Sequence, residues 1–364
     1  FLGVELGSTR IKAVGIDEHF RSAAAGDYTW HSEYLDSIWT YSLDNVWTGL
    51  RAALAPLAGE APRAAGISAM MHGYLVFDKD WQLLAPFRTW QNTMTADAAA
   101  ELTALFGFNI PQRWSIAHLY QAILNGEEHT RHIAHITTLA GYVHYMLTGV
   151  NAVGIGEASG IIPIDVNTRS YDSAMLDKFD ALIAPCGLDW KIRDILPDVL
   201  LAGDDAGALT ADGAELLGGA RPVGTPFVPC EGDAETGMVA SNAIKARTGN
   251  VSAGTSMFAM LVLERPLTRI YPEIDLVATP EGRYAAMVHC NNGTNDMNAW
   301  VGILREAAAL FGASPDTGEL YTKLYAESLN GDADCGGITV FNYLAGEVIT
   351  GLDEGRPMVL RCPE

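Results

Sequence analysis

The sequence is poor in basic residues, with 23 lysines and arginines against 44 aspartates and glutamates in 364 residues. The formal net charge of −21 argues against nucleic acid as a partner, because phosphate backbones select basic surfaces. An anionic ligand would have to be neutralised locally, by a divalent cation, backbone N–H groups or a few well-placed side chains. The charge itself is typical of a soluble cytoplasmic surface.

Cysteine is also scarce. The five cysteines are an odd number, are scattered and show no Cys-x-x-Cys spacing, which argues against a disulfide framework or a zinc site and predicts a reducing, cytoplasmic compartment. His129, His132 and His135 fall three apart on an expected helix. No carboxylate or cysteine cluster joins them, so a polar helix face is favoured over a metal site.

Long apolar runs are missing as well. None reaches the roughly 18 residues needed to span a bilayer, so no membrane partner is expected. Hydrophobic residues nevertheless make up 49% of the chain, and 364 residues are too many for one ordinary core. We therefore expect a well-buried α/β protein of two domains.

Two similar hairpins mark the two expected domains. Residues 1–17 predict strand, turn and strand, because alternating apolar residues flank Gly7-Ser8-Thr9. Residues 247–262 repeat this pattern around Gly254-Thr255-Ser256. Without a low-complexity linker to mark it, the boundary rests on the motifs, and it divides the chain into domains 1–243 and 244–364.

Strands and helices are expected between the hairpins. Residues 66–78 predict a buried strand, a glycine break and a second strand. Helices are expected over residues 95–106, with Thr95 as N-cap and Gly107 as stop signal, and over 114–124 and 132–147. Residues 151–166 read as strand or loop.

The first hairpin turn could bind an anion. Gly7 permits close approach, Ser8 and Thr9 offer hydroxyls, and Arg10 or Lys12 could add positive charge. Glu5 precedes the turn, where a carboxylate can hold Mg²⁺ through waters. The Walker spacing GxxxxGK[ST] is absent, and an ordinary β-turn remains the alternative.

Asp233 follows Gly232 at the end of an apolar run. A carboxylate there is well placed at a cleft, where it could orient a hydroxyl and accept its proton. The alternative is a turn or N-cap aspartate. Met71-His72-Gly73 and Trp90-Gln91-Asn92 could line a sugar pocket through hydroxyl and C–H contacts, although core packing explains such residues equally well.

The order of these motifs resembles the FGGY carbohydrate kinases, which include glycerol kinase, xylulokinase and ribulokinase. The resemblance covers essentially the whole chain. It is carried by six stretches: Glu5–Lys12, Met71–Gly73, Trp90–Asn92, Leu147–Gly149, Glu157–Ser159 and Glu231–Asp233, followed by the second hairpin turn, Ser252–Ser256.

The resemblance implies two ribonuclease-H-like domains of the actin/hexokinase ATPase type around a central cleft, binding ATP and Mg²⁺. Asp233 would be the general base and, with Glu5, a metal contact. Phosphate contacts would come from Gly7, Ser8, Thr9, Arg10, Lys12, Gly254, Thr255 and Ser256. Sugar contacts would come from Met71, His72, Trp90, Asn92 and Asp233.

Three residues depart from the family pattern. Glu5, Asn92 and Glu157 each stand where the family usually has aspartate, and this puts the identity of the sugar in doubt more than the reaction. The family also continues through a glycine-rich adenosine-binding segment, so we expect the C-terminal domain here to be incomplete and name no contacts to the nucleotide base.

Together these features predict an ATP-dependent kinase for a small sugar, preferably a ketopentose such as xylulose or ribulose, and a possible homodimer. One alternative is a catalytically weak, sugar-binding, actin-like sensor, which Glu5 and Asn92 favour. Another is an actin- or chaperone-like ATPase with a protein partner, which the Met71–Gly73 and Trp90 region disfavours.

Overall fold

The computed structural model describes residues 1–57, 61–254, 257–344, 346–347, 350, 352 and 355–361. It divides into two compact units. The first comprises Phe1–Gly249 and Leu261–Ala286, and the second comprises Asn250–Met260 and Met287–Glu364. The predicted boundary at residues 243/244 stays a prediction. Among the described residues, no helix is both long and apolar enough to cross a membrane.

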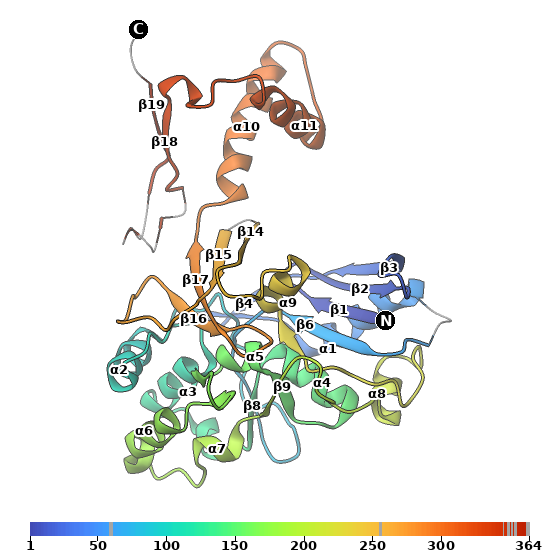
Figure 1. Ribbon diagram of the computed structural model, residues 1–364, viewed down its shortest axis with the longest axis vertical. Coiled ribbons are helices and arrows are strands. Elements are labelled where there is room, and N and C mark those ends of the chain that lie inside the picture. Colours follow the sequence, from blue (N-terminus) through green and yellow to red (C-terminus); the bar gives the residue numbers. More distant parts are fainter. Residues whose placement is uncertain are drawn as a thin grey trace. The chain divides into compact units, whose positions relative to one another are not determined.

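The first unit contains a five-stranded mixed sheet, with α2 (Ala96–Phe106), α3 (Ser115–Leu124), α6 (Ser173–Ile183) and α7 (Ile192–Ile195) away from it (Figure 1). Its strands are β1 (Leu2–Leu6), β2 (Arg10–Ile16), β3 (Ser22–Thr29), β6 (Ala65–Ala69) and β13 (Glu231–Gly232), in the order β13-β6-β1-β2-β3. The β1–β2 and β2–β3 pairs are antiparallel, whereas β6 runs parallel to both β1 and β13. This is the strand order expected of a ribonuclease-H-like core.

Alternation along the first hairpin explains why helix α1 (Leu43–Leu54) packs against this sheet. Ile11 and Ala13 of β2 are fully buried, and the buried side of α1 includes Leu50 and Leu54. Helix and strands approach closely, because a Cβ on Gly49 of α1 would lie 2.8 Å from the Tyr28 ring on β3. A larger residue at position 49 would push the helix off the sheet.

Further elements complete the first unit. The helices are α2 (Ala96–Phe106), α3 (Ser115–Leu124), α4 (Leu139–Thr148), α5 (Ile155–Ser159), α6 (Ser173–Ile183), α7 (Ile192–Ile195), α8 (Ala211–Leu216) and α9 (Asp233–Ala240). Short strands are β4 (Glu33–Leu35), β5 (Ile38–Thr40), β7 (Leu75–Phe77), β8 (His135–Thr137), β9 (Ala152–Gly154), β10 (Ile164–Asp165), β11 (Ser170–Tyr171) and β12 (Asp198–Leu200).

A second sheet has the order β14-β15-β17-β16, and its strands contribute residues to both units. Its strands are β14 (Gly249–Ala253), β15 (Met257–Val262), β16 (Asp275–Ala278) and β17 (Tyr284–Cys290). In the first unit, two contacts connect β16 to the helices. Asp275 forms an ion pair with Arg113, just before α3, and the Ala278 N–H donates to the Ser159 hydroxyl of α5 at 2.9 Å. The second unit adds α10 (Thr294–Leu310), α11 (Thr317–Ser328) and the antiparallel hairpin of β18 (Thr339–Phe341) and β19 (Met358–Leu360).

Most predicted elements are confirmed, including both hairpins, β6 with β7, and the helices α2 and α3. The helix expected over 132–147 is wrong at its start. It begins only at Leu139, because Thr138 caps it by accepting the Gly141 N–H, and residues 135–137 form β8 instead. His135 therefore lies on a strand rather than on a helix with His129 and His132.

Two smaller expectations also change. Residues 155–159, read as strand or loop, form α5. Helix α2 begins and ends as predicted, but the Thr95 side chain makes no capping bond. The Thr95 hydroxyl donates instead to the Gln112 carbonyl at 2.5 Å, so it ties the start of α2 to the loop before α3.

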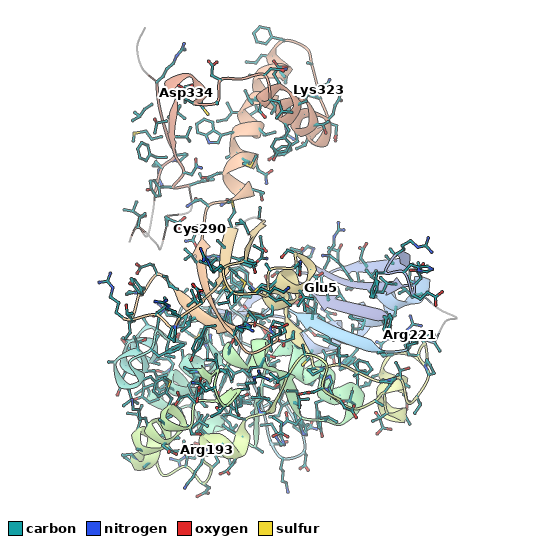
Figure 2. All side chains as sticks on the ribbon, in the orientation of Figure 1. Glu5, Arg193, Arg221, Cys290, Lys323 and Asp334 are labelled. Carbon is teal, nitrogen blue, oxygen red and sulfur yellow. The ribbon has the colours of Figure 1, made fainter. Side chains whose placement is uncertain are left out.

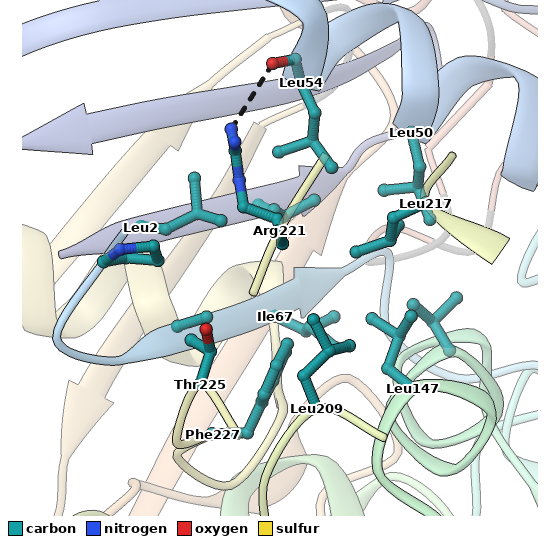
Figure 3. Close-up of a pocket in the computed structure, with 14 residues that line it drawn as sticks. Leu2, Leu50, Leu54, Ile67, Leu147, Leu209, Leu217, Arg221, Thr225 and Phe227 are labelled. Atoms are coloured by element: carbon teal, nitrogen blue, oxygen red, sulfur yellow. Dashed lines mark hydrogen bonds between the residues drawn. The ribbon is translucent and has the colours of Figure 1, made fainter. Parts of the chain in front are cut away.

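A small apolar cavity of about 20 Å³ lies in the core of the first unit, beside β1 and β6 (Figure 3). Leu2, Leu50, Ile67 and Leu147 are among the side chains that line it. Arg221 also borders the cavity, and its guanidinium donates to the Leu54 carbonyl at 3.4 Å. With about one probe sphere of space and a mostly apolar lining, this cavity is a packing gap and not a ligand site.

Replacing Leu50 by alanine is expected to lower the free energy of unfolding by about 3 kcal/mol, because it enlarges a gap that the rigid sheet cannot collapse. Leu50 is 1% exposed. Leu83→Ala is the matched control, since Leu83 is 42% exposed, and a change within about 0.5 kcal/mol is expected for it. Urea denaturation measures both, and equal losses would contradict this packing account.

Candidate active site

The candidate site lies at one edge of the first sheet. The parallel strands β1, β6 and β13 are in register where they end, with Leu6 opposite Ala69 and Ala69 opposite Gly232. The residues that follow these positions, Gly7, Met70 and Asp233, therefore emerge at the same edge. The carboxyl ends of parallel strands are where ligands bind in open α/β sheets.

Aromatic side chains fix the hairpin turn at this edge. The Gly7 N–H donates to the Arg10 carbonyl at 2.9 Å and closes the turn. The Trp30 indole donates to the Gly7 carbonyl and the Tyr41 hydroxyl donates to the Ser8 carbonyl, each at 2.7 Å. The two rings contact each other, with centroids 4.5 Å apart. The turn's carbonyls are therefore held against Trp30 and Tyr41.

This arrangement leaves donors available on the other side of the turn. In the part of the chain that the structure describes, the N–H groups and hydroxyls of Ser8 and Thr9 have no intramolecular acceptor. A turn whose carbonyls are occupied and whose donors remain unused can bind an anion. Its geometry thus fits the phosphate role predicted for Gly7, Ser8 and Thr9, which itself stays a prediction.

Charged side chains flank the turn. Glu5 lies directly opposite Lys12 in the β1–β2 register, and their charged groups are 3.2 Å apart. Both side chains are almost half exposed, so this pair contributes little to stability. Figure 2 labels Glu5 in the first unit. Arg10 is exposed and adds positive charge beside the turn.

Asp233 is the first residue of helix α9, and Gly232 takes the N-cap position. The helix is held next to β6 by a 2.8 Å bond between the hydroxyls of Ser68 and Thr236. A carboxylate in the first turn of a helix is stabilised by the helix dipole. Asp233 is therefore not the N-cap of α9, which is the alternative role that the sequence allows; it is the residue after the N-cap.

Burial raises the pKa of Asp233 to about 6, against its ordinary value of 3.8. The backbone N–H of Met71 acts in the opposite direction, while the negative charge of Glu5 raises the pKa further. A carboxyl with a pKa near 6 is still ionised at neutral pH and is a stronger base than an ordinary aspartate. The site therefore contains a group suited to accept a proton.

Gly232 is required by the close packing around Asp233. A Cβ at this position would collide with Met71 and the Glu235 carboxyl and would lie 2.8 Å from Oε2 of Glu157. Any other residue would have to displace these buried side chains. Gly232 has an ordinary φ of −70°, so packing and not backbone conformation requires the glycine.

Three buried glutamates lie beside this glycine: Glu157, Glu231 and Glu235. Burial raises the pKa of Glu231 to about 8 and raises the pKa values of Glu157 and Glu235 well above the ordinary range. The Thr138 hydroxyl partly offsets the effect in Glu157. Glu231 is consequently mostly neutral at pH 7.

Glu231 connects the cluster to helix α5. Its carboxyl accepts the Glu157 N–H at 2.8 Å and the Gly156 N–H at 3.4 Å. The Glu231 carboxyl thus holds the start of α5 against β13. No group of three or more His, Cys, Asp or Glu side chains arranged to hold a metal ion is found among the described residues.

On the side predicted to bind sugar, Met71 and His72 are buried. His72 adopts a positive φ of 65°, a strained conformation for a residue other than glycine. Its ring stacks on Trp114, with centroids 6.2 Å apart, and its Nδ1 is 3.5 Å from the Gly160 carbonyl. Such strain concentrates at functional sites and is consistent with a binding role here.

Trp90 is half-buried, whereas the carboxamide of Asn92 is engaged inside the protein. Its Oδ1 accepts the Trp39 N–H at 2.8 Å, and its Nδ2 donates to the carbonyls of Trp39 at 2.8 Å and Thr89 at 3.0 Å. Asn92 therefore anchors the Trp39 backbone to the loop of residues 89–92. Its predicted sugar contact stays a prediction.

Asn92→Ala is expected to destabilise the protein by about 2 to 3 kcal/mol, because backbone groups of Trp39 and Thr89 lose partners in a buried place. The KM for sugar should then change only through local loosening. Thermal unfolding and sugar titration measure the two effects separately. Unchanged stability with a large loss of sugar affinity would instead support a direct sugar contact.

The second hairpin turn is only partly described. Thr255 and Ser256 lie outside the described residues. Gly254 accepts the Thr294 N–H at 2.8 Å with its carbonyl, next to the start of α10. The phosphate role of all three residues stays a prediction.

Sequence reasoning missed several residues near the site. Trp30 and Tyr41 hold the turn from 23 and 33 positions away, and Trp114 stacks on His72. The aromatic residues before residue 42 are visible in the sequence, but the sequence does not show which backbone groups they bond to.

The strand order and the donor-rich turn define an α/β protein of the actin/hexokinase-like ATPase fold, and similarity to solved structures confirms this. The structure of xylulose kinase from Rhodospirillum rubrum matches with a TM-score of 0.79 and 19% identity, covering 100% of this chain and 72% of that one. The predicted fold class is confirmed.

Sequence comparison then identifies the family. The N-terminal domain model of the FGGY family of carbohydrate kinases matches residues 1–240, and the C-terminal domain model matches residues 249–362. The chain belongs to the FGGY family of carbohydrate kinases.

Curated relatives agree with this assignment. Xylulose kinase from Klebsiella pneumoniae is 23% identical over 95% of this chain and 69% of its own length. Autoinducer-2 kinase from Escherichia coli K12 is 25% identical over 77% of this chain. The alignment spans only 54% of the second relative's length.

Proposed function

We propose that the protein transfers the terminal phosphate of ATP to a hydroxyl of a small sugar, preferably a ketopentose such as xylulose or ribulose, with Asp233 as the general base. The observation that carries this proposal is the position of Asp233. It emerges at the same sheet edge as the turn after β1, so one carboxylate and one turn with unused N–H and hydroxyl donors lie at the same edge.

The proposed chemistry needs little from the protein beyond positioning and charge neutralisation. The N–H groups and hydroxyls at Ser8 and Thr9 would bind phosphate oxygens, with Arg10 and Lys12 adding positive charge. Asp233 would accept a hydrogen bond from the sugar hydroxyl, aim its oxygen and take its proton as the new O–P bond forms. ATP supplies the phosphoryl group when bound.

The carboxylates also fit a magnesium ion. Mg²⁺ is usually held by one or two carboxylates, with waters and substrate phosphates completing its shell. Glu5 and Asp233 provide two such groups, and the effect of Glu5 on the pKa of Asp233 reflects their proximity. Because Lys12 is paired with Glu5, we propose that Lys12 turns toward a bound phosphate when the ion is present.

We propose that Met71, His72 and Trp90 contribute to the sugar side. The Met71 side chain packs so closely on Gly232 that a Cβ there would collide with it. Because Gly232 precedes Asp233, the Met71–His72 segment borders the proposed base. A half-buried Trp90 offers a ring for the C–H face of a sugar. The curated relatives are xylulose and autoinducer-2 kinases, and the first of these favours the ketopentose preference.

The sensor alternative keeps one supporting observation. Lys12 pairs with the Glu5 carboxylate, so this carboxylate would be less available to a metal ion. Turnover would then be weak, while sugar binding would be intact. Tight sugar binding without any phosphosugar product would support that alternative. Family membership leaves the actin- or chaperone-like ATPase alternative without support.

The proposal is tested by a coupled ADP-release assay with a panel of ketopentoses, aldopentoses, polyols and sugar acids, at saturating MgATP. Turnover with at least one ketopentose, and phosphosugar detected by mass spectrometry, is the expected result. ATP hydrolysis without phosphosugar, or calorimetric binding without turnover across the panel, would overturn it. The possible homodimer stays a prediction.

A further inference from the structure

A second, much larger pocket lies in the first unit, away from the residues discussed so far. Its volume is about 570 Å³, within the range of small-molecule sites. Four segments form its walls: the β10–β11 turn, the chain after β12, the chain after β15 and the β16–β17 turn. No residue of the candidate active site lines it.

Backbone hydrogen bonds join these walls to one another. The Ala202 N–H donates to the Pro280 carbonyl at 3.0 Å, and the Leu263 N–H donates to the Tyr284 carbonyl at 2.8 Å. The Tyr284 hydroxyl donates to the Ile164 carbonyl at 2.9 Å. Each bond connects a different pair of segments, so the pocket is preorganised.

Arginines give the pocket its charge. Arg169, Arg265 and Arg283 come from three different walls and outnumber the two lining glutamates, Glu264 and Glu281. This excess stands out in a chain whose formal net charge is −21. Arginine is also the residue best shaped to bind phosphate or carboxylate through two parallel hydrogen bonds.

Two of these arginines are not committed to ion pairs. Arg283 lies 3.6 Å from Glu281 across a half-exposed pair, which is weak. Arg169 and Arg265 form no salt bridge within the described residues. Their guanidinium groups are therefore free to bind an incoming anion without first breaking an internal contact.

Arg169 is also held in place where it lines the pocket. Its backbone takes a positive φ of 55°, while its N–H donates to the Asp165 carbonyl at 2.8 Å. Gly282, at φ 81°, lies against it, since a Cβ there would be 3.5 Å from Cγ of Arg169 and 3.7 Å from Leu201. The two turns thus meet where the arginine stem leaves the backbone.

We propose that this pocket binds a small organic anion carrying phosphate or carboxylate groups, through Arg169 and Arg265 with Arg283 in support, at a site separate from the candidate active site. This proposal does not depend on the proposed kinase activity. The open mouth and the arginines on separate walls suit a ligand with two charged ends better than a single small ion.

Isothermal titration calorimetry in about 0.1 M NaCl tests the proposal, with pyrophosphate and citrate as probes. At least one probe should bind the native protein with a Kd below about 1 mM. The Arg169→Ala/Arg265→Ala double variant should bind it at least tenfold more weakly, as expected when two charge-assisted contacts are lost. Arg131→Ala is the matched control, because Arg131 is an exposed arginine outside the pocket.

The probes distinguish the two chemistries. Stronger binding of pyrophosphate indicates phosphate groups, and stronger binding of citrate indicates carboxylates. Circular dichroism should show the double variant folded, with an unchanged melting temperature. The proposal is overturned if neither probe binds, or if a probe binds the double variant and the native protein equally, which would place it elsewhere, such as at the Ser8–Thr9 turn. Glu264→Gln should tighten binding, and weaker binding in that variant would also count against the site.

Discussion

Asp233→Asn is expected to lower kcat by about 10² to 10⁴, the range typical of removing a general base, with little change in the Kd for sugar. Asparagine keeps the shape and the hydrogen-bonding position at the start of α9 but cannot accept a proton. Sugar binding by calorimetry and turnover by ADP release measure the two quantities independently. Asp97→Asn is the matched control, since Asp97 is an exposed acid in the first turn of another helix, α2.

The pH profile gives this prediction a second readout. Only ionised Asp233 can accept a proton, and its pKa is about 6. Turnover should therefore rise about tenfold per pH unit below pH 6 and level off above it. A profile that stays flat down to about pH 5, or native kcat in the Asp233→Asn variant, would remove Asp233 from the role of base.

The first hairpin and Asp233 could be predicted because their signals are local. Alternating apolar residues around Gly7 leave one pairing that buries both Val4 and Ile11. Asp233 follows a short apolar run and a glycine, and packing explains why that glycine is needed: Met71 and Glu157 approach too closely for a Cβ. Sequence order alone suggested the motif, and the fold supplies its physical reason.

The start of helix α4 could not be predicted from apolar spacing. Residues 132–138 fit a helical pattern, but His135–Thr137 pair with β7, a strand far earlier in the chain. The Thr138 hydroxyl then provides the N-cap. Tertiary pairing outweighed local periodicity, as is usual for short ambiguous stretches.

Asn92 shows the same limit at the site. Beside Trp90 it suggests a sugar contact by its chemistry, yet its carboxamide bonds to the Trp39 backbone, 53 positions earlier. A polar side chain in such a motif can bond to the protein's own backbone instead of to a ligand. Only the three-dimensional position of that backbone partner distinguishes the two roles. Trp30 and Tyr41 were missed for the same reason, because their role is to hold a distant turn.

The buried glutamates lead to the second large prediction: their contribution to stability should be lost as pH rises. A carboxyl whose pKa is raised on folding stabilises the protein fully below its unfolded value, near 4.5, and that contribution is lost as pH rises through the folded pKa. For Glu231 the folded pKa is about 8. The free energy of unfolding should then fall by about 1.4 kcal/mol per pH unit, or on the order of 3 kcal/mol between pH 5.5 and 7.5 from this group alone.

Glu235→Gln tests this directly, because glutamine keeps the side-chain shape but cannot ionise. Its effect should depend on pH. Relative to the native protein, the variant should gain stability as pH rises above the unfolded pKa, near 4.5, whatever its offset at low pH. Glu18→Gln, at an exposed position, should give a pH profile parallel to that of the native protein. Parallel profiles for Glu235→Gln as well would show that Glu235 is not neutral in the folded protein.

The opposite trend at low pH comes from a different carboxyl. Burial alone would raise the pKa of Glu127, but hydrogen bonds from Arg88 and Asn125 and the nearby positive charge lower it below its ordinary value. Its contribution is therefore present above its unfolded pKa and lost as pH falls through the folded one. Burial also lowers the pKa of His118 to about 3 and that of His144 to about 4. Like Glu127, these groups make stability rise with pH up to their unfolded values, whereas the cluster of Glu157, Glu231 and Glu235 makes it fall. The proposed catalysis through Asp233 would need pH above about 6. The burial that makes Asp233 a stronger base also raises the pKa of Glu231 to about 8, so as pH rises above 6 the expected activity increases while this glutamate's contribution to stability is lost.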